Sequence, residues 1–333
     1  MKWPFADCTL RFSHNAYIRE ISLAKQARQS GLIIRSQSGF YTVETEAGLV
    51  TCRLRGRLKR GPRLGDILAV GDWVKLSIQP DGSGMIEEIE ERKRMFSRMA
   101  PTPRGEYQQI LIANPDQVVL VFACAEPEPR LRMLDRFLVV AEKAETPSLI
   151  VFNKVDLVGI ERAHEKFGHY DVLGYPVLYT SVESGMGVSE LEEQLAGKIS
   201  ILAGPSGVGK SSLLNKIQPG LGLSVRDIST SNRKGRHTTV VRELFHLIGG
   251  GYVADTPGLK ALALWDIEPE EVDGYFPELR DLVADCQFSN CTHIHEPGCA
   301  VKKAVEDELV HFDRYDSYVR MRLGEEDAQA DAY

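Results

Sequence analysis

Two short motifs in this chain contain residue types that bind nucleotide phosphates and bases. The first, GPSGVGKSS at 204 to 212, fits G-x-x-x-x-G-K-[ST] and lies between an apolar run, ISILA, and a helical pattern. Its glycines would let backbone amides turn toward phosphate oxygens, Lys210 would neutralise the β and γ oxygens, and Ser211 would hold Mg²⁺. With Lys210 also assigned to catalysis, the predicted phosphate-binding residues are Gly204, Pro205, Ser206, Gly207, Val208, Gly209, Lys210, Ser211 and Ser212.

The second motif, NKVD at 153 to 156, has the chemistry to read guanine. It ends the apolar run SLIVF, which places it at the carboxyl end of a strand, where ligands bind to parallel sheets. Asp156 can accept hydrogen bonds from guanine N1–H and the 2-amino group, whereas adenine offers no matching donors. Asn153 can satisfy the O6 and N7 side and tie neighbouring loops, Lys154 can lie along the ring, and the Ser181 amide could help hold O6. The predicted guanine-binding residues are Asn153, Lys154, Val155, Asp156 and Ser181.

Two further segments carry groups expected around Mg²⁺ and the γ-phosphate. DTPG follows the strand pattern YVA, so that Asp255 would reach Mg²⁺ through water and the Gly258 amide would contact the γ-phosphate. The polar stretch SNRKGRHTTVV, which begins at Ser231, lies where a switch loop presents a threonine to Mg²⁺. Thr238 and Thr239 both fit that role, and the sequence does not choose between them. The predicted magnesium ligands are therefore Ser211, Asp255 and one of these two threonines.

The order of these motifs is unusual, because a guanine-reading tetrapeptide normally follows the phosphate loop and here precedes it. Strands stay neighbours when old termini are joined and new ones are cut in a surface loop, so a permuted order is physically tolerable. We therefore predict a circularly permuted P-loop GTPase domain that binds GTP with Mg²⁺. DTPG would then lie in the last sheet strand before the C-terminal unit, and movement of its loop on hydrolysis could move that unit.

A third motif combines three cysteines and a histidine near the C-terminus. CQFSNCTHIHEPGC supplies Cys286-x4-Cys291-x-His293-x5-Cys299. Three thiolates and an imidazole suit one closed, tetrahedral, structural Zn²⁺ site, which leaves no open position for catalysis. His295 is a rival to His293 as the fourth ligand.

The patterns around these motifs predict three folded units. Five short alternating segments with glycine turns between residues 31 and 98 favour a small OB-fold β-barrel, and PTPRGEY at 101 to 107 is typical of a linker. Strands and helices then alternate from Asp116, as in a doubly wound α/β sheet, and the chain becomes helical after Trp265. The predicted organisation is an N-terminal extension (1–31), the OB-fold barrel (32–100), the circularly permuted GTPase domain (101–265), a helical zinc-binding domain (266–323) and an acidic tail (324–333).

Charge is distributed unevenly along the 333 residues. A formal net charge of −7 argues against a protein that coats nucleic acid with its whole surface, but residues 51 to 63 carry six basic side chains and no acid. This segment is either a solvated loop or a phosphate-binding surface, and we favour RNA contacts by Arg55, Arg57, Lys59 and Arg60. No apolar run approaches the roughly 20 residues of a membrane span, and the first residues do not form a secretory leader. We expect a cytoplasmic monomer without a membrane partner.

With the barrel, the permuted motifs and the cysteine cluster in this order, the chain resembles the bacterial ribosome small-subunit-dependent GTPase A family. The resemblance extends from about residue 32 to 322, and its motifs are CRLRGRLK, VGDWV, LDRFL, NKVDL, GPSGVGKSSLLN, GRHTT, DTPGL, CQFSNCTHIHEPGCAVKKAV and RYDSY. It implies a factor that acts late in small-subunit maturation, with slow GTP hydrolysis that the subunit accelerates. It also implies that the barrel and the zinc domain bind ribosomal RNA. The expected partners are therefore GTP, GDP, the small ribosomal subunit and its rRNA.

The residue after DTPG bears on the catalytic step. Ras-type enzymes place a water-orienting glutamine there, whereas this chain has Leu259, which cannot orient water. The resemblance points to His237 in GRHTT as a substitute that the ribosome would position. Two competing functions are an RNA-binding assembly scaffold with weak nucleotide turnover and an ATP-dependent RNA-processing enzyme. The intact phosphate loop opposes the first, and NKVD opposes the second.

Overall fold

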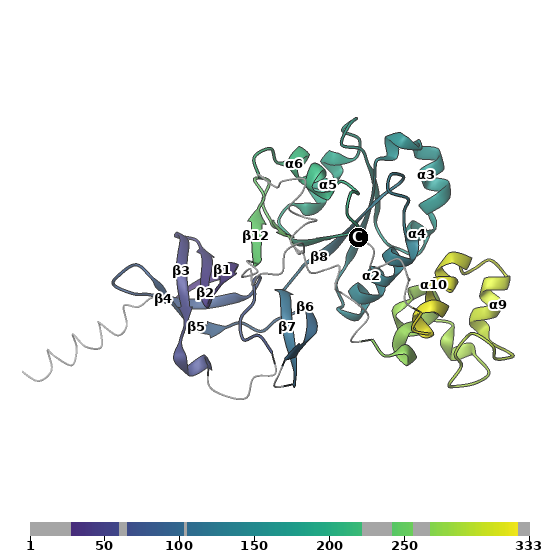
Figure 1. Cartoon of the computed structure of the whole chain (residues 1–333), viewed down its shortest axis with the longest axis horizontal. Coiled ribbons are helices and arrows are strands. Elements are labelled where there is room, and N and C mark those ends of the chain that lie inside the picture. The colour runs from purple at the N-terminus through teal and green to yellow at the C-terminus, as the bar shows by residue number, and fades with distance from the viewer. Residues whose placement is uncertain (1–27, 60–64, 103–104, 222–241, 256–266, 326–333) are drawn as a thin grey trace, which may run out of the picture.

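The computed structural model describes residues 28–59, 65–102, 105–221, 242–255 and 267–325. Three units follow one another along the long axis of the molecule (Figure 1): a β-barrel, a central α/β unit and a helical C-terminal unit. The predicted extension at 1–31 and acidic tail at 324–333 lie almost entirely outside the described residues. Within the described part of the chain, no helix has the length and apolar character to cross a membrane.

Five strands form the barrel, as predicted. They are β1 (Gln29–Gln37), β2 (Phe40–Thr45), β3 (Gly48–Leu54), β4 (Trp73–Ile78) and β5 (Gly84–Ile89), with a short 3-10 helix, η1 (Gly56–Lys59), after β3. They pair in the order β1-β2-β3-β5-β4, and β4 returns to pair with β1, which closes the barrel. Leu32, Val43, Leu76 and Ile86 fill its interior. The OB-like fold is confirmed.

The predicted linker at 101–107 is wrong. Strands β6 (Met95–Thr102) and β7 (Gly105–Ala113) form an antiparallel ribbon across this region, so the predicted boundary at residue 100 falls inside a hairpin. Proline and glycine suggested a linker, but a two-stranded ribbon has only edge strands, which tolerate proline.

The central unit is a sheet with helices on both faces. Its strands are β8 (Gln117–Ala123), β9 (Ser148–Asn153), β10 (Val177–Thr180), β11 (Ile199–Ala203), β12 (Arg242–His246) and β13 (Tyr252–Asp255). They lie in the order β10-β9-β8-β11-β13-β12, and all except β12 run parallel. Although β11 comes late in the chain, it lies in the middle of the sheet. This is the arrangement that the permuted motif order predicted.

Alternate residues of the central strands explain why helices cover both faces. Leu120 and Phe122 pack with the helices α2 (Leu131–Lys143), α3 (Ile160–Phe167) and α4 (His169–Val172). Their neighbours Val119 and Val121 pack with α5 (Val188–Leu195) and α6 (Lys210–Ile217) on the opposite face. A strand buried on both faces is apolar throughout, which is why β8 has no exposed residue.

The C-terminal unit is built from short helical elements. They are η4 (Pro269–Tyr275), α8 (Pro277–Arg280), η5 (Val283–Asp285), α9 (Ala300–Glu306) and α10 (Phe312–Arg322). Val272, Phe276, Leu279 and Tyr318 form its core together with Val139 of α2. The unit therefore packs on the central unit through α2.

Candidate nucleotide and zinc sites

The nucleotide motifs meet at one edge of the central sheet. The parallel strands end there together, since Ala123 is in register with Asn153, Asn153 with Thr180, and Leu202 with Asp255. The phosphate loop follows β11 at this edge. Segments that are far apart in the sequence are thus brought to the carboxyl ends of neighbouring strands, the usual ligand position in such sheets.

The phosphate loop wraps around its own lysine. Gly204 has φ +141° and Gly209 has φ +98°, values that favour glycine, and a Cβ atom on Gly204 would lie 2.0 Å from the Val121 carbonyl oxygen. The Lys210 ammonium donates to the carbonyls of Gly204 (2.8 Å) and Pro205 (2.6 Å). Lys210 begins α6 and Ser211 is buried in its first turn. Backbone amides at a helix N-terminus are suited to bind phosphate.

Asn153 connects the guanine motif to the phosphate loop. Its side chain is 1% exposed, its Nδ2 donates to the Val208 carbonyl (2.8 Å), and its Oδ1 accepts from Thr180 Oγ1 (3.1 Å). A Cβ atom on Gly209 would lie only 2.3 Å from Asn153 Nδ2. Glycine at this position therefore permits the contact between the two loops. Thr180 was not among the predicted residues, although its place at the end of a strand and directly before Ser181 was a usable signal.

The other guanine-motif residues differ in accessibility. Lys154 adopts a left-handed conformation (φ +63°), and its ammonium donates to the Glu126 carbonyl. Asp156 is exposed in the short 3-10 helix η2 (Val155–Leu157), where a ligand can reach it, whereas the Val155 side chain packs in the core.

The Ser181 amide is directed away from the role predicted for it. It donates to the Met186 carbonyl (2.9 Å), because residues 181 to 186 form a tight loop that Ser181 Oγ also stabilises by accepting from the Ser184 amide. A base would need a different backbone donor from this loop. The sequence did not predict this hydrogen bond, because the local sequence of a loop does not determine which of its backbone groups pair with one another.

Several predicted residues cannot be placed. His237, Thr238, Thr239 and Gly258 lie outside the described residues. The backbone of Asp255 ends β13 beside Leu202, two positions before Gly204 in the neighbouring strand. This register puts the start of DTPG next to the phosphate loop.

The cysteine cluster has the geometry of a metal site. The ligand atoms of Cys286, Cys291, His293 and Cys299 all lie within 4.8 Å of one another. The Cys286 and Cys299 sulfurs are 3.9 Å apart, and His293 Nδ1 lies 3.5 Å and 3.4 Å from them. Tetrahedral Zn²⁺ with Zn–S bonds of about 2.3 Å requires sulfurs about 3.8 Å apart. The four residues fit such an ion.

Neighbouring groups orient the imidazole of this cluster. His293 Nε2 lies 3.2 Å from Asp273 Oδ2, so that Nδ1 faces the thiols, and the Tyr315 hydroxyl donates to the His293 carbonyl (2.6 Å). A carboxylate on the second nitrogen is a common partner of a metal-bound histidine. His293 is fully buried, whereas its rival His295 is exposed and outside the cluster. The geometry favours His293.

The basic segment is less free than its sequence indicated. Arg55 and Arg57 both pair with Glu87, which is almost fully buried in β5. The hydrogen bond from Arg55 is the main reason that the pKa of Glu87 is lowered. Lys59 ends η1, and Arg60 lies outside the described residues. One predicted pair of RNA-binding side chains is therefore held by an internal carboxylate.

Comparisons with known proteins agree with this architecture. Residues 89–265 match the family described as RsgA GTPase, and residues 30–86 match the RsgA N-terminal domain. The chain is 44% identical over 297 residues to the small ribosomal subunit biogenesis GTPase RsgA of Gemmatimonas aurantiaca, covering 88% of this chain and 96% of that protein. It is 40% identical over 304 residues to RsgA 2 of Bacteroides thetaiotaomicron, covering 90% and 98%.

Solved structures show the same likeness. The crystal structure of YjeQ from Thermotoga maritima has a TM-score of 0.72 and 40% identity, covering 89% of this chain and 98% of that one. YloQ, described as a circularly permuted GTPase, has a TM-score of 0.68 and 34% identity, covering 90% and 96%. The matches confirm both the permuted fold and the resemblance inferred from the motifs. The chain belongs to the RsgA GTPase family and is a GTP hydrolase.

Proposed function

We propose that this GTPase acts late in the maturation of the small ribosomal subunit, and that the subunit stimulates GTP hydrolysis to drive release of the protein or a checkpoint. The observation that supports the proposal is the contact between the guanine and phosphate motifs at Asn153 and Gly209. The chain also matches relatives named small ribosomal subunit biogenesis GTPase over nearly their full length. A vestigial nucleotide site would have no need of a glycine at that contact.

We assign the nucleotide roles as follows. Asp156 accepts from guanine, Asn153 holds the two loops together, and the loop from Gly204 to Ser212 surrounds the phosphates. The Val182 amide takes the O6 contact in place of Ser181, because the Ser181 amide is occupied by Met186. Mg²⁺, when bound with GTP, neutralises the β and γ oxygens, and Ser211, Asp255 and either Thr238 or Thr239 would hold it.

Hydrolysis without the ribosome is expected to be slow. Leu259 offers no hydrogen-bonding group to an attacking water, so the water must be oriented by another side chain. We assign this role to His237, which the ribosomal contact would position. His237→Ala should then abolish stimulation by the subunit while leaving GTP affinity unchanged. Stimulated turnover that survives this substitution would remove His237 from the mechanism.

The flanking units are proposed to bind ribosomal RNA. One structural Zn²⁺ on Cys286, Cys291, His293 and Cys299 would hold the C-terminal unit together. On the barrel, Arg55, Arg57, Lys59 and Arg60 would contact phosphates, the first two while also paired with Glu87. The protein would work as a cytoplasmic monomer.

The test is phosphate release from GTP by the purified protein, with and without small ribosomal subunits, at two salt concentrations. Strong stimulation that fades with salt is expected, because Lys and Arg contacts to phosphates release counterions. Slow hydrolysis that subunits do not change would contradict the proposal and favour an RNA-binding assembly scaffold with weak turnover.

Guanine selection has its own test. Asp156→Asn should weaken GTP binding by about a hundredfold or more, since two hydrogen bonds to a charged group, each worth roughly 1.5–3 kcal/mol, are disrupted. Asp171→Asn, which changes an exposed acid of α4 elsewhere in the same unit, is the matched control and should bind GTP normally. Equal GTP affinity for both variants would exclude Asp156 from base recognition.

A further inference from the structure

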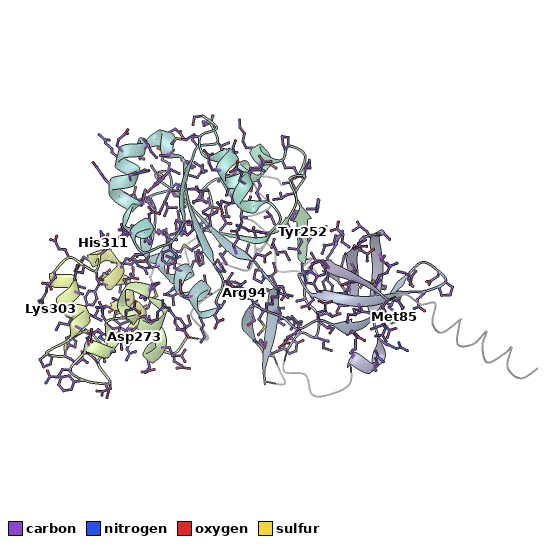
Figure 2. All side chains as sticks on the ribbon, turned by 180° about the vertical axis from the view of Figure 1, so that it is seen from behind. Met85, Arg94, Tyr252, Asp273, Lys303 and His311 are labelled. Carbon is purple, nitrogen blue, oxygen red and sulfur yellow. The ribbon has the colours of Figure 1, made fainter. Side chains whose placement is uncertain are left out.

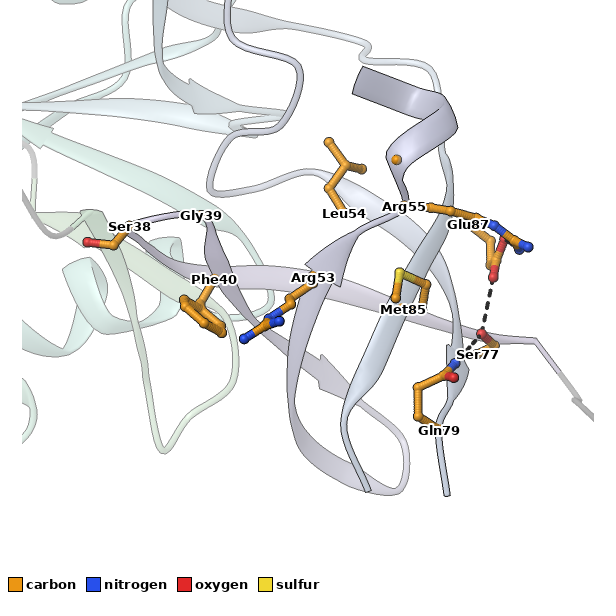
Figure 3. A pocket seen from close by; sticks show the side chains of 11 residues that line it. Ser38, Gly39, Phe40, Arg53, Leu54, Arg55, Ser77, Gln79, Met85 and Glu87 are labelled. Carbon is orange, nitrogen blue, oxygen red and sulfur yellow. Dashed lines mark hydrogen bonds and ion pairs between the residues drawn. The ribbon is translucent and has the colours of Figure 1, made fainter. Parts of the chain in front are cut away.

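One face of the barrel carries a row of side chains that no nucleotide motif uses. Phe40 of β2 is in register with Arg53 of β3, Arg53 with Met85 of β5, and Met85 with Ser77 of β4. Residues directly opposite one another on neighbouring strands point to the same face. An aromatic ring, a guanidinium, a thioether and a hydroxyl therefore lie side by side across four strands (Figure 3).

The row lines a cavity of about 630 Å³ on the barrel surface. Small-molecule sites occupy roughly 300–1,000 Å³, so the cavity can hold a nucleoside-sized group. Its wall includes Gly39, Gly56 and Gln79 besides the row itself.

The Arg53 guanidinium lies over the Phe40 ring, and both side chains line this cavity. The Phe40 side chain is 44% exposed, and the Arg53 guanidinium carbon lies 4.6 Å from its ring centroid, within cation–π distance. Within the described residues Arg53 forms no ion pair, in contrast to Arg55 and Arg57. An exposed aromatic ring beside a cation is the combination on which bases of single-stranded nucleic acid stack, while the cation meets their phosphates.

The floor of the cavity is a fixed hydrogen-bond chain. Ser77 Oγ donates to Glu87 Oε1 (3.2 Å), and Gln79 Nε2 donates to Ser77 Oγ (3.3 Å). Because the Ser77 hydroxyl has a single hydrogen and gives it to an acceptor-only carboxylate, it can only accept from Gln79. This fixes the Gln79 amide with its nitrogen toward Ser77 and leaves its oxygen to accept from a base edge.

Glu87 does not repel a polyanion as strongly as an isolated acid would. It is 5% exposed, and its carboxylate accepts from Arg55 and from Arg57 Nη2 (3.4 Å). The charged residues that line the cavity are Arg53, Arg55 and Glu87, so its lining is net positive on a chain of net charge −7. This positive charge therefore complements the phosphates of RNA and would repel a basic protein.

We propose that this cavity binds an unpaired nucleobase of RNA, stacked on the Phe40–Arg53 pair and contacted at its edge by Gln79. The inference rests on the proposed RNA-binding function of the barrel and adds a base site to its phosphate contacts. It predicts that affinity depends on bases as well as on charge, which contacts from Arg55 and Arg57 alone would not produce.

The experiment measures binding of a labelled single-stranded RNA oligonucleotide to the full chain, beside an oligonucleotide of equal length and charge that lacks bases. Phe40→Leu, which keeps an apolar side chain but removes the π face, should weaken binding of the first roughly five- to hundredfold. The salt dependence of binding should not change, since no phosphate contact is lost. Phe40→Tyr, which keeps the ring, should bind like the original chain.

Trp73→Leu is the matched control. Trp73 is an equally exposed aromatic residue (43%) of the same barrel, but it does not line the cavity, so this variant should bind normally. The proposal is overturned if the oligonucleotide without bases binds equally well, if the full chain fails to bind RNA, or if the Phe40 and Trp73 variants behave alike. Subunit-stimulated GTP hydrolysis, measured on the original chain, tests the proposed function separately from these outcomes.

Discussion

The two outer units are joined to the GTPase unit by different kinds of interaction. At the C-terminal unit the join is ionic and buried: Arg314 of α10 donates to Asp135 of α2 (2.7 Å) and to Glu278 of α8 (2.7 Å), and its side chain is 1% exposed. Asp135 also accepts from Tyr170 and Ser317. Such a network is satisfied in only one geometry, so it fixes the C-terminal unit on α2.

The barrel shares a hydrophobic cluster with the GTPase unit and is also joined to it by strand pairing. β1 pairs antiparallel with β12, with Arg35 opposite Glu243, so that barrel and central strands form one sheet of eleven strands. The Tyr252 hydroxyl of β13 donates to Glu44 of β2 (2.8 Å), and Figure 2 shows Tyr252 at this boundary. The Arg35 and Glu243 side chains are 3.9 Å apart and partly exposed, a pair of little energetic weight.

The difference indicates which unit can respond to the nucleotide. β12 begins directly after the segment that holds His237, so strand pairing links that segment to the barrel. The described contacts of the C-terminal unit run instead to α2 and α4, on the helical face, where His311 also stacks on His169. We therefore expect a change of bound nucleotide to affect the barrel more directly than the C-terminal unit. The order of motifs alone had predicted that the C-terminal unit would move.

Removing the metal should have the largest effect. Structural Zn²⁺ contributes about 10–16 kcal/mol to folding in zinc-finger peptides, so chelation should unfold the C-terminal unit and spare the barrel. Hydrogen exchange should show lost protection in α9 and α10 and retained protection in β1 to β5. His293→Ala should reproduce the loss and His295→Ala should not. Normal α9 and α10 protection after verified metal removal would contradict a structural role for the cluster.

Disrupting the buried ion pairs of Arg314 should have the second-largest effect. Arg314→Met leaves Asp135 and Glu278 buried without their cation, and should lower the free energy of unfolding by about 3–5 kcal/mol. Arg320→Met changes the same helix at a partly exposed pair with Asp316 (3.0 Å), and should cost less than about 1 kcal/mol. Denaturant unfolding measures both. Equal losses would mean that burial does not distinguish the two arginines.

The barrel join should respond more weakly. Tyr252→Phe removes one hydrogen bond and should cost about 0.5–1.5 kcal/mol. Glu44→Gln and the double variant complete a double-mutant cycle, which isolates the energy of the contact. A Tyr252–Glu44 coupling energy as large as the loss of stability from Arg314→Met would show that the two interfaces do not differ in strength.

The smallest effect is expected from pH within the barrel. Hydrogen bonding by Arg55 lowers the pKa of Glu87 in the folded chain, so this ion pair stabilises the barrel above the unfolded carboxyl pKa of roughly 4.3 and is lost as pH falls through the lower folded value. Because both arginines are about half exposed, the contribution should stay below about 1 kcal/mol. Glu87→Gln should lower the melting temperature slightly at pH 7 and by less at pH 3. A larger loss at pH 3 would reverse the predicted sign.

Local patterns predicted most of the site. The phosphate loop, NKVD and the Cys286 cluster are contiguous signals, because neighbouring residues on one turn supply most ligands. Buried strands such as β8 were visible as apolar runs, and the five barrel strands as alternating ones. Three contacts between separate segments were not predicted: the hydrogen bond from Thr180 to Asn153, the ion pair of Arg55 with Glu87, and the pairing of β6 with β7.

By itself the sequence determined the chemistry of the protein: a guanine reader, a phosphate loop and four metal-binding side chains, each defined by residue type and local spacing. Only the tertiary structure decided how these parts act on one another. It placed β11 between β8 and β13, fixed the C-terminal unit through Arg314, and joined the barrel to β12. The reason is physical: a motif needs only the geometry of one turn, whereas burial and pairing depend on segments that meet after the chain has folded.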